Sequence, residues 1–64
     1  MTTIFTKRFQ ELSFIDQFKV VDATLGDLRN AYRHAADARS RRNFARMIRR
    51  IEKRWEAMLE EVAA

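Results

Sequence analysis

Cysteine and proline are absent from this sequence, and Gly26 is its only glycine. Without cysteine the chain forms neither disulfides nor thiolate metal sites, and a single histidine, His34, excludes a histidine-cluster site. The near absence of proline and glycine removes most tight turns and favours long helices. We therefore expect a largely helical chain with no bound metal and no cofactor.

Long apolar runs are also missing. No stretch approaches the roughly 20 apolar residues of a membrane span, or the apolar core of a signal peptide. The lack of cysteine fits the cytoplasm. The sequence contains neither a carboxylate pair with the neighbours of an acid–base site nor a nucleophile elbow, so it has no pattern that indicates catalysis. The sequence thus predicts a cytoplasmic, non-enzymatic protein with no membrane partner and no small-molecule substrate.

The composition is that of an ordered protein, with 47% hydrophobic and 11% aromatic residues among 64. This length allows a single domain, 1–64. Chains this short bury only about 60% of the surface that their unfolded form exposes, and they usually need a disulfide, a metal or a partner subunit. With the first two excluded, self-association is the expected source of additional stability.

The C-terminal part carries the clearest helical pattern. Its apolar residues recur at alternating spacings of four and three, and Ser40 can cap the start, which predicts a helix over 41–63. The apolar positions are Phe44, Ile48, Ile51, Trp55, Met58 and Val62.

The middle of the chain repeats this pattern and predicts a second helix over 14–36, with Ser13 as its N-cap. Gly26 costs about 1 kcal/mol inside a helix relative to alanine, and a break at this residue is the alternative. Two helices of about 35 Å joined by a short turn predict an antiparallel hairpin over 13–64. The apolar positions are Phe14, Phe18, Val21, Leu25, Leu28 and Tyr32.

Residues 1–12 are predicted to form an N-terminal arm with one or two helical turns. Phe5 and Phe9 have helical spacing, which favours packing of both rings in a core or interface. If the arm does not pack, Phe5 and Phe9 form an exposed patch suited to contact with another protein.

The apolar stripes of both helices are wide and rich in aromatic residues. A lone hairpin would leave part of each stripe in water, at about 25 cal/mol per Å² of apolar area. We expect two hairpins to pair as a homodimeric four-helix bundle, which covers this area. In the alternative, the arm folds over the hairpin as a third layer and the chain stays monomeric.

The formal net charge is +4, and ten of the thirteen bases are arginine. Six bases fall at outer positions of the C-terminal heptad pattern, away from its apolar residues, and we call them the arginine ridge: Arg39, Arg42, Arg46, Arg49, Arg50 and Lys53. The guanidinium fork suits carboxylate and phosphate. The ridge predicts binding to an acidic protein surface or to nucleic acid, or else it is a solvated helix face.

Arg29-Asn30, followed after three residues by His34, resembles the motif of HEPN ribonucleases, in which a paired Arg and His act on RNA across a dimer interface. The resemblance implies that Arg29 and His34 are catalytic and that Asn30 supports them. It covers only this segment, and the chain lacks room for the helices that precede the motif in that family.

The function predicted first is that of a small regulatory or adaptor protein. Such a protein would bind a macromolecular partner, most favourably another protein, as a helical-hairpin homodimer. Nucleic-acid binding through the arginine ridge is the alternative, and the HEPN-like ribonuclease is a second alternative.

Overall fold

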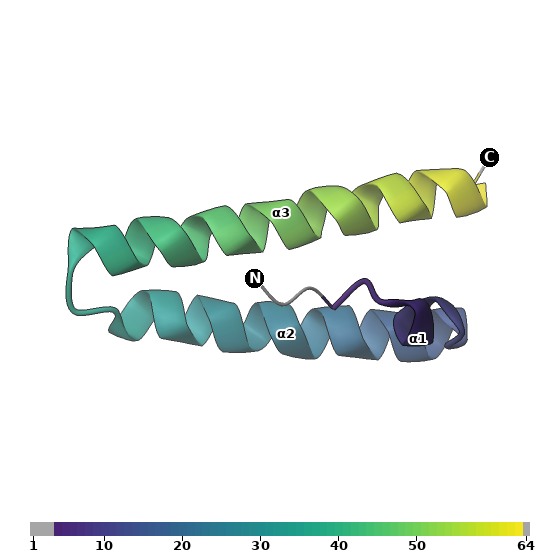
Figure 1. Ribbon diagram of the computed structural model, residues 1–64, viewed down its shortest axis with the longest axis horizontal. Coiled ribbons are helices and arrows are strands. Elements are labelled where there is room, and N and C mark those ends of the chain that lie inside the picture. Colours follow the sequence, from purple (N-terminus) through teal and green to yellow (C-terminus); the bar gives the residue numbers. More distant parts are fainter. Residues whose placement is uncertain (1–3, 64) are drawn as a thin grey trace.

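The computed structural model describes residues 4–63, in which three α-helices and no strand occur. They are α1 (Lys7–Gln10), α2 (Phe14–His34) and α3 (Ala38–Ala63). α2 and α3 lie side by side and run in opposite directions, and α1 lies near the end of this pair that is remote from the turn (Figure 1). The molecule measures 40 × 19 × 18 Å. The predicted all-α fold class is confirmed.

Side-chain hydroxyls begin the first two helices. The Thr6 hydroxyl accepts a hydrogen bond from the backbone N–H of Phe9 at 3.2 Å, and this bond starts the single turn of α1. Ser13 Oγ accepts from the backbone N–H of Asp16, also at 3.2 Å. Each hydroxyl satisfies a backbone donor that has no partner within its helix. The prediction of Ser13 as N-cap is confirmed.

The second helix passes through Gly26 without a break and ends at His34, two residues before the predicted end. Gly26 is exposed, and a Cβ built on it meets no atom within 4 Å. No neighbour therefore requires glycine at this position, and the packing of the helix overrides its low helical propensity.

The third helix begins at Ala38, so the prediction of Ser40 as its N-cap is wrong. Asp37 Oδ1 accepts from the backbone N–H of Ser40 at 2.7 Å, and Asp37 Oδ2 accepts from the Ser40 hydroxyl at 3.3 Å. The carboxylate precedes the serine by three residues, which is the spacing of an N-cap to the donor it satisfies. These two hydrogen bonds, the backbone one foremost, hold the pKa of Asp37 below its ordinary value.

Replacing Asp37 with alanine should lower the melting temperature at neutral pH, because the Ser40 N–H loses its acceptor. Since the folded pKa of Asp37 lies below the unfolded one, its carboxylate stabilises the fold above the unfolded pKa. That contribution is lost as the pH falls through the folded pKa. The difference in melting temperature between Asp37→Ala and the wild type should therefore shrink from about pH 4 downward. Circular dichroism melts between pH 7 and pH 2 measure it, and a pH-independent difference would contradict this assignment.

The core lies at the arm end of the molecule. Its buried side chains are Phe9, Val21, Leu25 and Trp55, at 2–8% exposure. The Trp55 ring meets Phe9 edge-on, with centroids 6.3 Å apart, and stacks on Phe14 at 5.7 Å. Gln17 Nε2 donates to the backbone oxygen of Phe9 at 3.1 Å. The arm therefore supplies part of the core of this single chain.

The predicted apolar positions divide into three groups. Val21, Leu25 and Trp55 are buried. Five are half-buried: Leu28, Phe44, Ile48, Ile51 and Met58. The other four are exposed by 42–73% and lie outside the core of a single chain: Phe14, Phe18, Tyr32 and Val62.

The possible protein contact through Phe5 and Phe9 is not available in this structure. Phe9 is buried, and Phe5 is half-buried with its ring 5.2 Å from that of Phe9. The physical reason is the Thr6 cap, which turns the arm into α1 and directs Phe9 onto Trp55. At this end of the molecule the arm packs over the helix pair as a third layer, which is the arrangement that the sequence offered as the alternative.

Candidate functional site

The arginine ridge lies on the outer face of α3. All six side chains are exposed. Arg46 lies nine residues from the buried Trp55, which places the two about 180° apart around the helix at 100° per residue. The ridge is therefore opposite the core, and its six cations reach solvent along one side of the helix.

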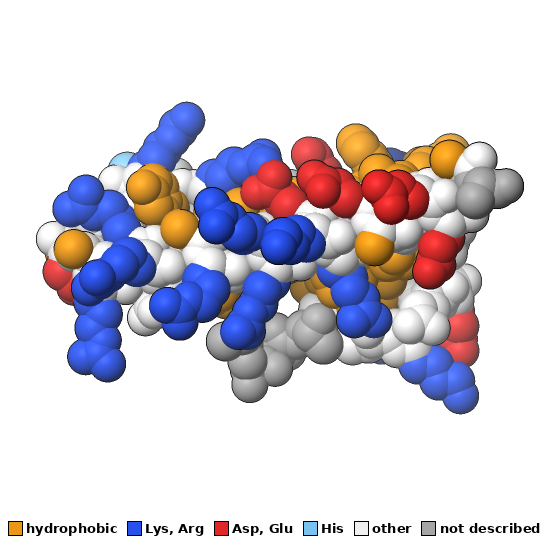
Figure 2. Space-filling model, turned by 90° about the horizontal axis from the view of Figure 1, so that it is seen from above, with side chains coloured by type: hydrophobic (Ala, Val, Ile, Leu, Met, Phe, Trp, Pro, Cys, Tyr) orange, Lys and Arg blue, Asp and Glu red, His pale blue; other side chains and the backbone are white. Residues whose placement is uncertain are grey.

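Positive charge is concentrated in the half of the molecule next to the turn. Residues 28–50 contain eight arginines and one acid, Asp37, for a formal net charge of +7. The flanking segments 1–27 and 51–64 have net charges of −1 and −2. Figure 2 shows Lys and Arg side chains over the half of α3 near the turn and acids gathered farther along. The fold thus has a basic end and a weakly acidic end.

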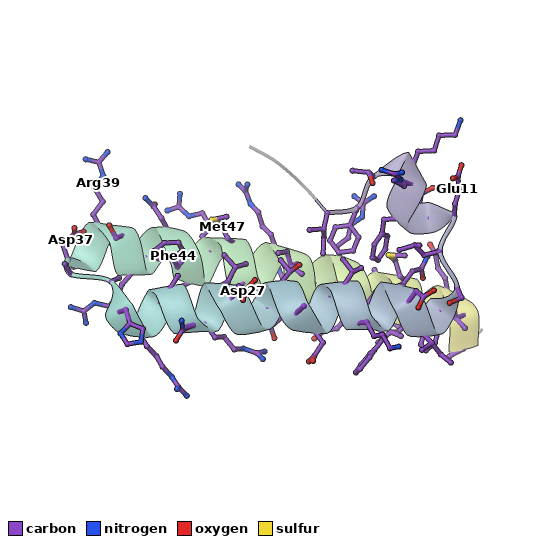
Figure 3. The ribbon with its side chains drawn as sticks, turned by 90° about the horizontal axis from the view of Figure 1, so that it is seen from below. Glu11, Asp27, Asp37, Arg39, Phe44 and Met47 are labelled. Atoms are coloured by element: carbon purple, nitrogen blue, oxygen red, sulfur yellow. The ribbon has the colours of Figure 1, made fainter. Side chains whose placement is uncertain are left out.

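Sequence reasoning missed one contributor to this basic end, Arg33, and left Arg41 out of the ridge. They lie outside the apolar seams and outside the ridge, and both are exposed. Arg33 is in the last turn of α2, and Arg41 is in the first turns of α3. Only the antiparallel arrangement of the two helices brings both to the same end, where Figure 3 shows Asp37 and Arg39, opposite the end with Glu11.

The order of charges along α3 opposes its helix dipole. The first turn contains no acid and the last turn contains no base. A base in the first turn, or an acid in the last turn, costs roughly 0.3–1 kcal/mol relative to a charge of the opposite sign. The arrangement is therefore not explained by the stability of an isolated helix, which makes the basic end a candidate binding surface.

The residues of the HEPN-like motif lie in the last turns of α2. Arg29, Asn30 and His34 are all exposed. Arg29 and His34 are five residues apart, which separates them by about 140° around the helix. One copy of the chain therefore does not direct the two side chains toward a single point.

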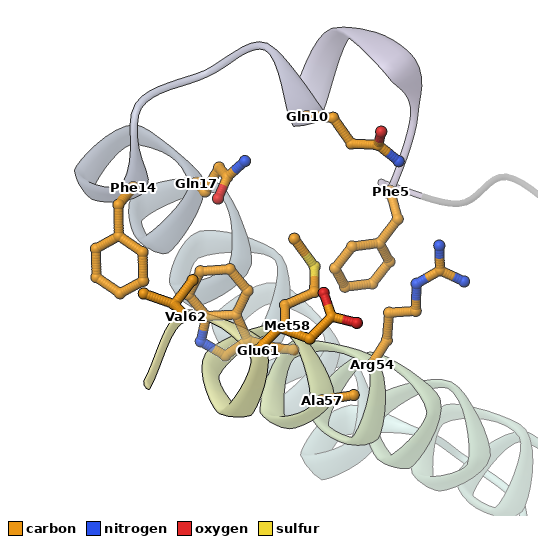
Figure 4. Close-up of a pocket in the computed structure, with 10 residues that line it drawn as sticks. Phe5, Gln10, Phe14, Gln17, Arg54, Ala57, Met58, Glu61 and Val62 are labelled. Atoms are coloured by element: carbon orange, nitrogen blue, oxygen red, sulfur yellow. The ribbon is translucent and has the colours of Figure 1, made fainter. Parts of the chain in front are cut away.

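A hollow of about 540 Å³ lies between the arm and the helix pair (Figure 4). Aromatic and apolar side chains such as Phe5, Trp55 and Met58 line it together with polar groups that include Gln17. The guanidinium carbon of Arg54 lies 5.4 Å from the centroid of the Phe5 ring, a cation–π contact at its rim. Its lining residues include no serine, cysteine, lysine or histidine.

A second hollow, of about 510 Å³, lies between α2 and α3, and none of its lining residues belongs to the arm. We call this side of the pair the open face. Its lining combines apolar side chains with charges of both signs. The residues are Arg29, Tyr32, Ala45, Ile48, Arg49, Glu52, Lys53 and Glu56.

Residues 4–63 contain no cluster of three or more His, Asp or Glu side chains that could hold a metal ion. None of the three helices, over the same residues, combines the length and hydropathy that a membrane crossing requires. Comparison with protein-family models, with curated proteins and with solved structures found no match to this chain.

Proposed function

We propose that this chain is a small non-enzymatic regulatory or adaptor protein that binds an acidic surface of another protein through the arginine ridge. In this proposal the chain works as a homodimer of helical hairpins that pair into a four-helix bundle. The observation that carries the proposal is the separation of charge: the net positive charge of the molecule comes from the turn half, and the ridge there is exposed.

An acidic protein patch fits the ridge better than a long polyanion does. From Arg39 to Lys53 the ridge spans about 21 Å at 1.5 Å per residue. Glu60 lies seven residues after Lys53, which places it on almost the same line of the helix, and it is exposed. A nucleic acid that lay along α3 beyond the ridge would meet Glu60, whereas a bounded acidic patch would not.

Nucleic acid remains the second candidate because the ridge is made almost entirely of arginine. Apart from the adjacent Arg49 and Arg50, successive ridge residues rise by about 4.5–6 Å along the helix, which allows several guanidinium groups to contact consecutive phosphates. Such binding would weaken steeply as the salt concentration rises, because counterions are released on association.

Charge reversal tests the proposal. The triple substitution Arg39→Glu, Arg42→Glu, Arg46→Glu should weaken binding to the protein partner by at least about 100-fold, because like charges placed together at an interface cost several kcal/mol. Loss of folding does not explain such a result, since acids near the start of α3 favour its dipole. Capture from lysate of the source organism, with and without nuclease treatment, identifies the proteins that the wild type and the triple variant retain.

The matched control is Lys7→Glu, Arg8→Glu, Lys19→Glu. It changes the net charge by the same amount at three exposed positions outside the turn half, and it should retain the partner. Partner retention by the ridge variant would mean that the ridge is only solvated. Loss of all capture after nuclease treatment would favour nucleic acid. RNA cleavage by the wild type that His34→Ala removes would favour the ribonuclease.

A further inference from the structure

Exposed apolar side chains lie beside the charged residues of the open face, and the arm does not line its hollow. Ile15, Phe18 and Tyr32 are 66%, 52% and 42% exposed. Phe18 lies eleven residues before Arg29, which lines the hollow, and Ile15 lies three residues before Phe18, so at 100° per residue these side chains follow one side of α2. The arm packs along one side of the pair (Figure 3), and the hollow on the open face contains none of its residues. Side chains of this size at half exposure indicate a surface that a partner covers.

Charges on the open face change sign along its length. Arg29 and Arg49 line the hollow together with Glu52 and Glu56. Arg29 is in the C-terminal half of α2 and Glu56 is in the C-terminal half of α3, so in an antiparallel pair they lie toward opposite ends. A partner that fits this face needs acids opposite the turn end and bases opposite the arm end.

A second copy of this chain has that distribution when it is turned end for end. The turn half, at +7, then faces the remainder of the partner, at −3 in total from the segments at −1 and −2. The same rotation brings Tyr32 toward the partner's exposed apolar residues near the arm. A parallel arrangement would instead place the two +7 halves together, which like-charge repulsion disfavours.

The dimensions of the molecule are compatible with a stable dimer. Its extents of 40 and 19 Å limit the projected area of one whole side to about 760 Å², which is of the same order as the roughly 800 Å² per partner of a standard interface. Arg39, Arg42 and Arg46 of the ridge do not line the open face, whereas Arg49 and Lys53 do. The part of each ridge from Arg39 to Arg46 would therefore stay accessible in the pair.

We propose that a second copy covers the open face in antiparallel orientation, with Phe18 and Tyr32 buried and with Arg29 and Arg49 of each copy opposite Glu52 and Glu56 of the other. This inference supplies the interface that the proposed function leaves unspecified. It assigns self-association to a surface that shares Arg49 and Lys53 with the arginine ridge and leaves Arg39, Arg42 and Arg46 to the protein partner.

The test is the mass in solution by sedimentation equilibrium. The wild type should have twice the 7.6 kDa of one chain at concentrations of tens of micromolar. Phe18→Asp should reduce the mass to that of one chain, and because Phe18 is 52% exposed the helical circular dichroism should persist. A wild type that stays at 7.6 kDa, or a Phe18→Asp variant that still dimerises, would overturn the proposal.

A charge exchange tests the pairing of charges across this face independently of folding. Arg29→Glu with Arg49→Glu leaves Lys53 as the only base among the residues that line the hollow, and Glu52→Arg with Glu56→Arg makes all of its charged lining residues basic. Each double variant alone should be monomeric, and an equimolar mixture should recover the dimer mass. A mixture that stays monomeric, or double variants that each dimerise, would contradict the antiparallel pairing.

The ridge variant Arg39→Glu, Arg42→Glu, Arg46→Glu separates the two proposals. It should keep the dimer mass while it loses the partner protein. A dimer without ridge-dependent binding would refute the proposed partner binding and leave this inference intact. Ridge-dependent binding by a monomer would refute this inference and the homodimer of the proposed function, and it would leave the ridge as the partner-binding surface.

Discussion

Trp55→Ala should leave most of the chain unfolded at 25 °C. The indole is 8% exposed, meets Phe9 edge-on and stacks on Phe14. Removing a buried aromatic side chain costs about 3–5 kcal/mol, and a core in a chain of this length rarely supplies more than about 3–5 kcal/mol in total. The substitution therefore removes most of the free energy of unfolding. Far-UV circular dichroism and a urea titration measure this loss.

The conservative variant Trp55→Phe provides the control. It keeps a ring against Phe9 and Phe14 and removes less buried area, so a cooperative urea transition should remain. A Trp55→Ala chain with a transition midpoint near that of the wild type would show that the core does not depend on the indole.

Phe9→Ala should release the arm and lower the free energy of unfolding by about 3 kcal/mol or more, as for other buried aromatic residues. Phe9 is 4% exposed, and its backbone oxygen accepts the hydrogen bond from Gln17. Loss of its ring opens one side of Trp55 to water. The fluorescence maximum of Trp55 should therefore shift to longer wavelength, and the urea midpoint should fall.

Phe14→Ala is the matched control, because Phe14 also contacts Trp55 but is 48% exposed. Its loss should cost less, about 0.5–1.5 kcal/mol for the aromatic pair and a further amount for its half-buried area. Equal effects of the two substitutions would mean that the arm adds nothing beyond one ring contact.

The long helices were predictable because their periodicity is strong and local. The seam from Phe44 to Val62 requires nothing beyond helical spacing, and α3 runs through it. The position of the turn was less predictable, since Asp37 and Ser40 can both cap a helix. In the structure they act together, with Asp37 as acceptor and Ser40 as donor. Sequence alone does not show which of these two residues caps α3.

Which phenylalanines are buried could not be predicted from spacing. Phe9 and Phe14 both reach Trp55, but Phe9 is buried and Phe14 is half exposed. The difference comes from the path of the arm, which depends on the Thr6 cap and on contacts distant in sequence. Hydrophobic periodicity identifies the apolar faces of helices, but it does not tell which other segment of the chain covers a given ring.

The arginine ridge was visible in the sequence because outer helical positions are defined as soon as the apolar seam is known. The wider basic end was not, since Arg33 joins it only through the antiparallel arrangement. The exposed aromatic rings of the open face were assigned to an apolar seam. Their exposure followed only from the structure.

The uneven placement of the core has a consequence for how the molecule opens. None of residues 28–50 is buried, and the nearest buried side chains beyond them are Leu25 and Trp55. Separation of the helices that starts at the turn exposes no fully buried side chain before it reaches these two residues, so such partial openings require less free energy than complete unfolding. The turn end of the molecule therefore opens at a lower cost in free energy than the arm end. The turn end carries the positive charge, and it can adjust its shape to a ligand while the aromatic cluster stays intact.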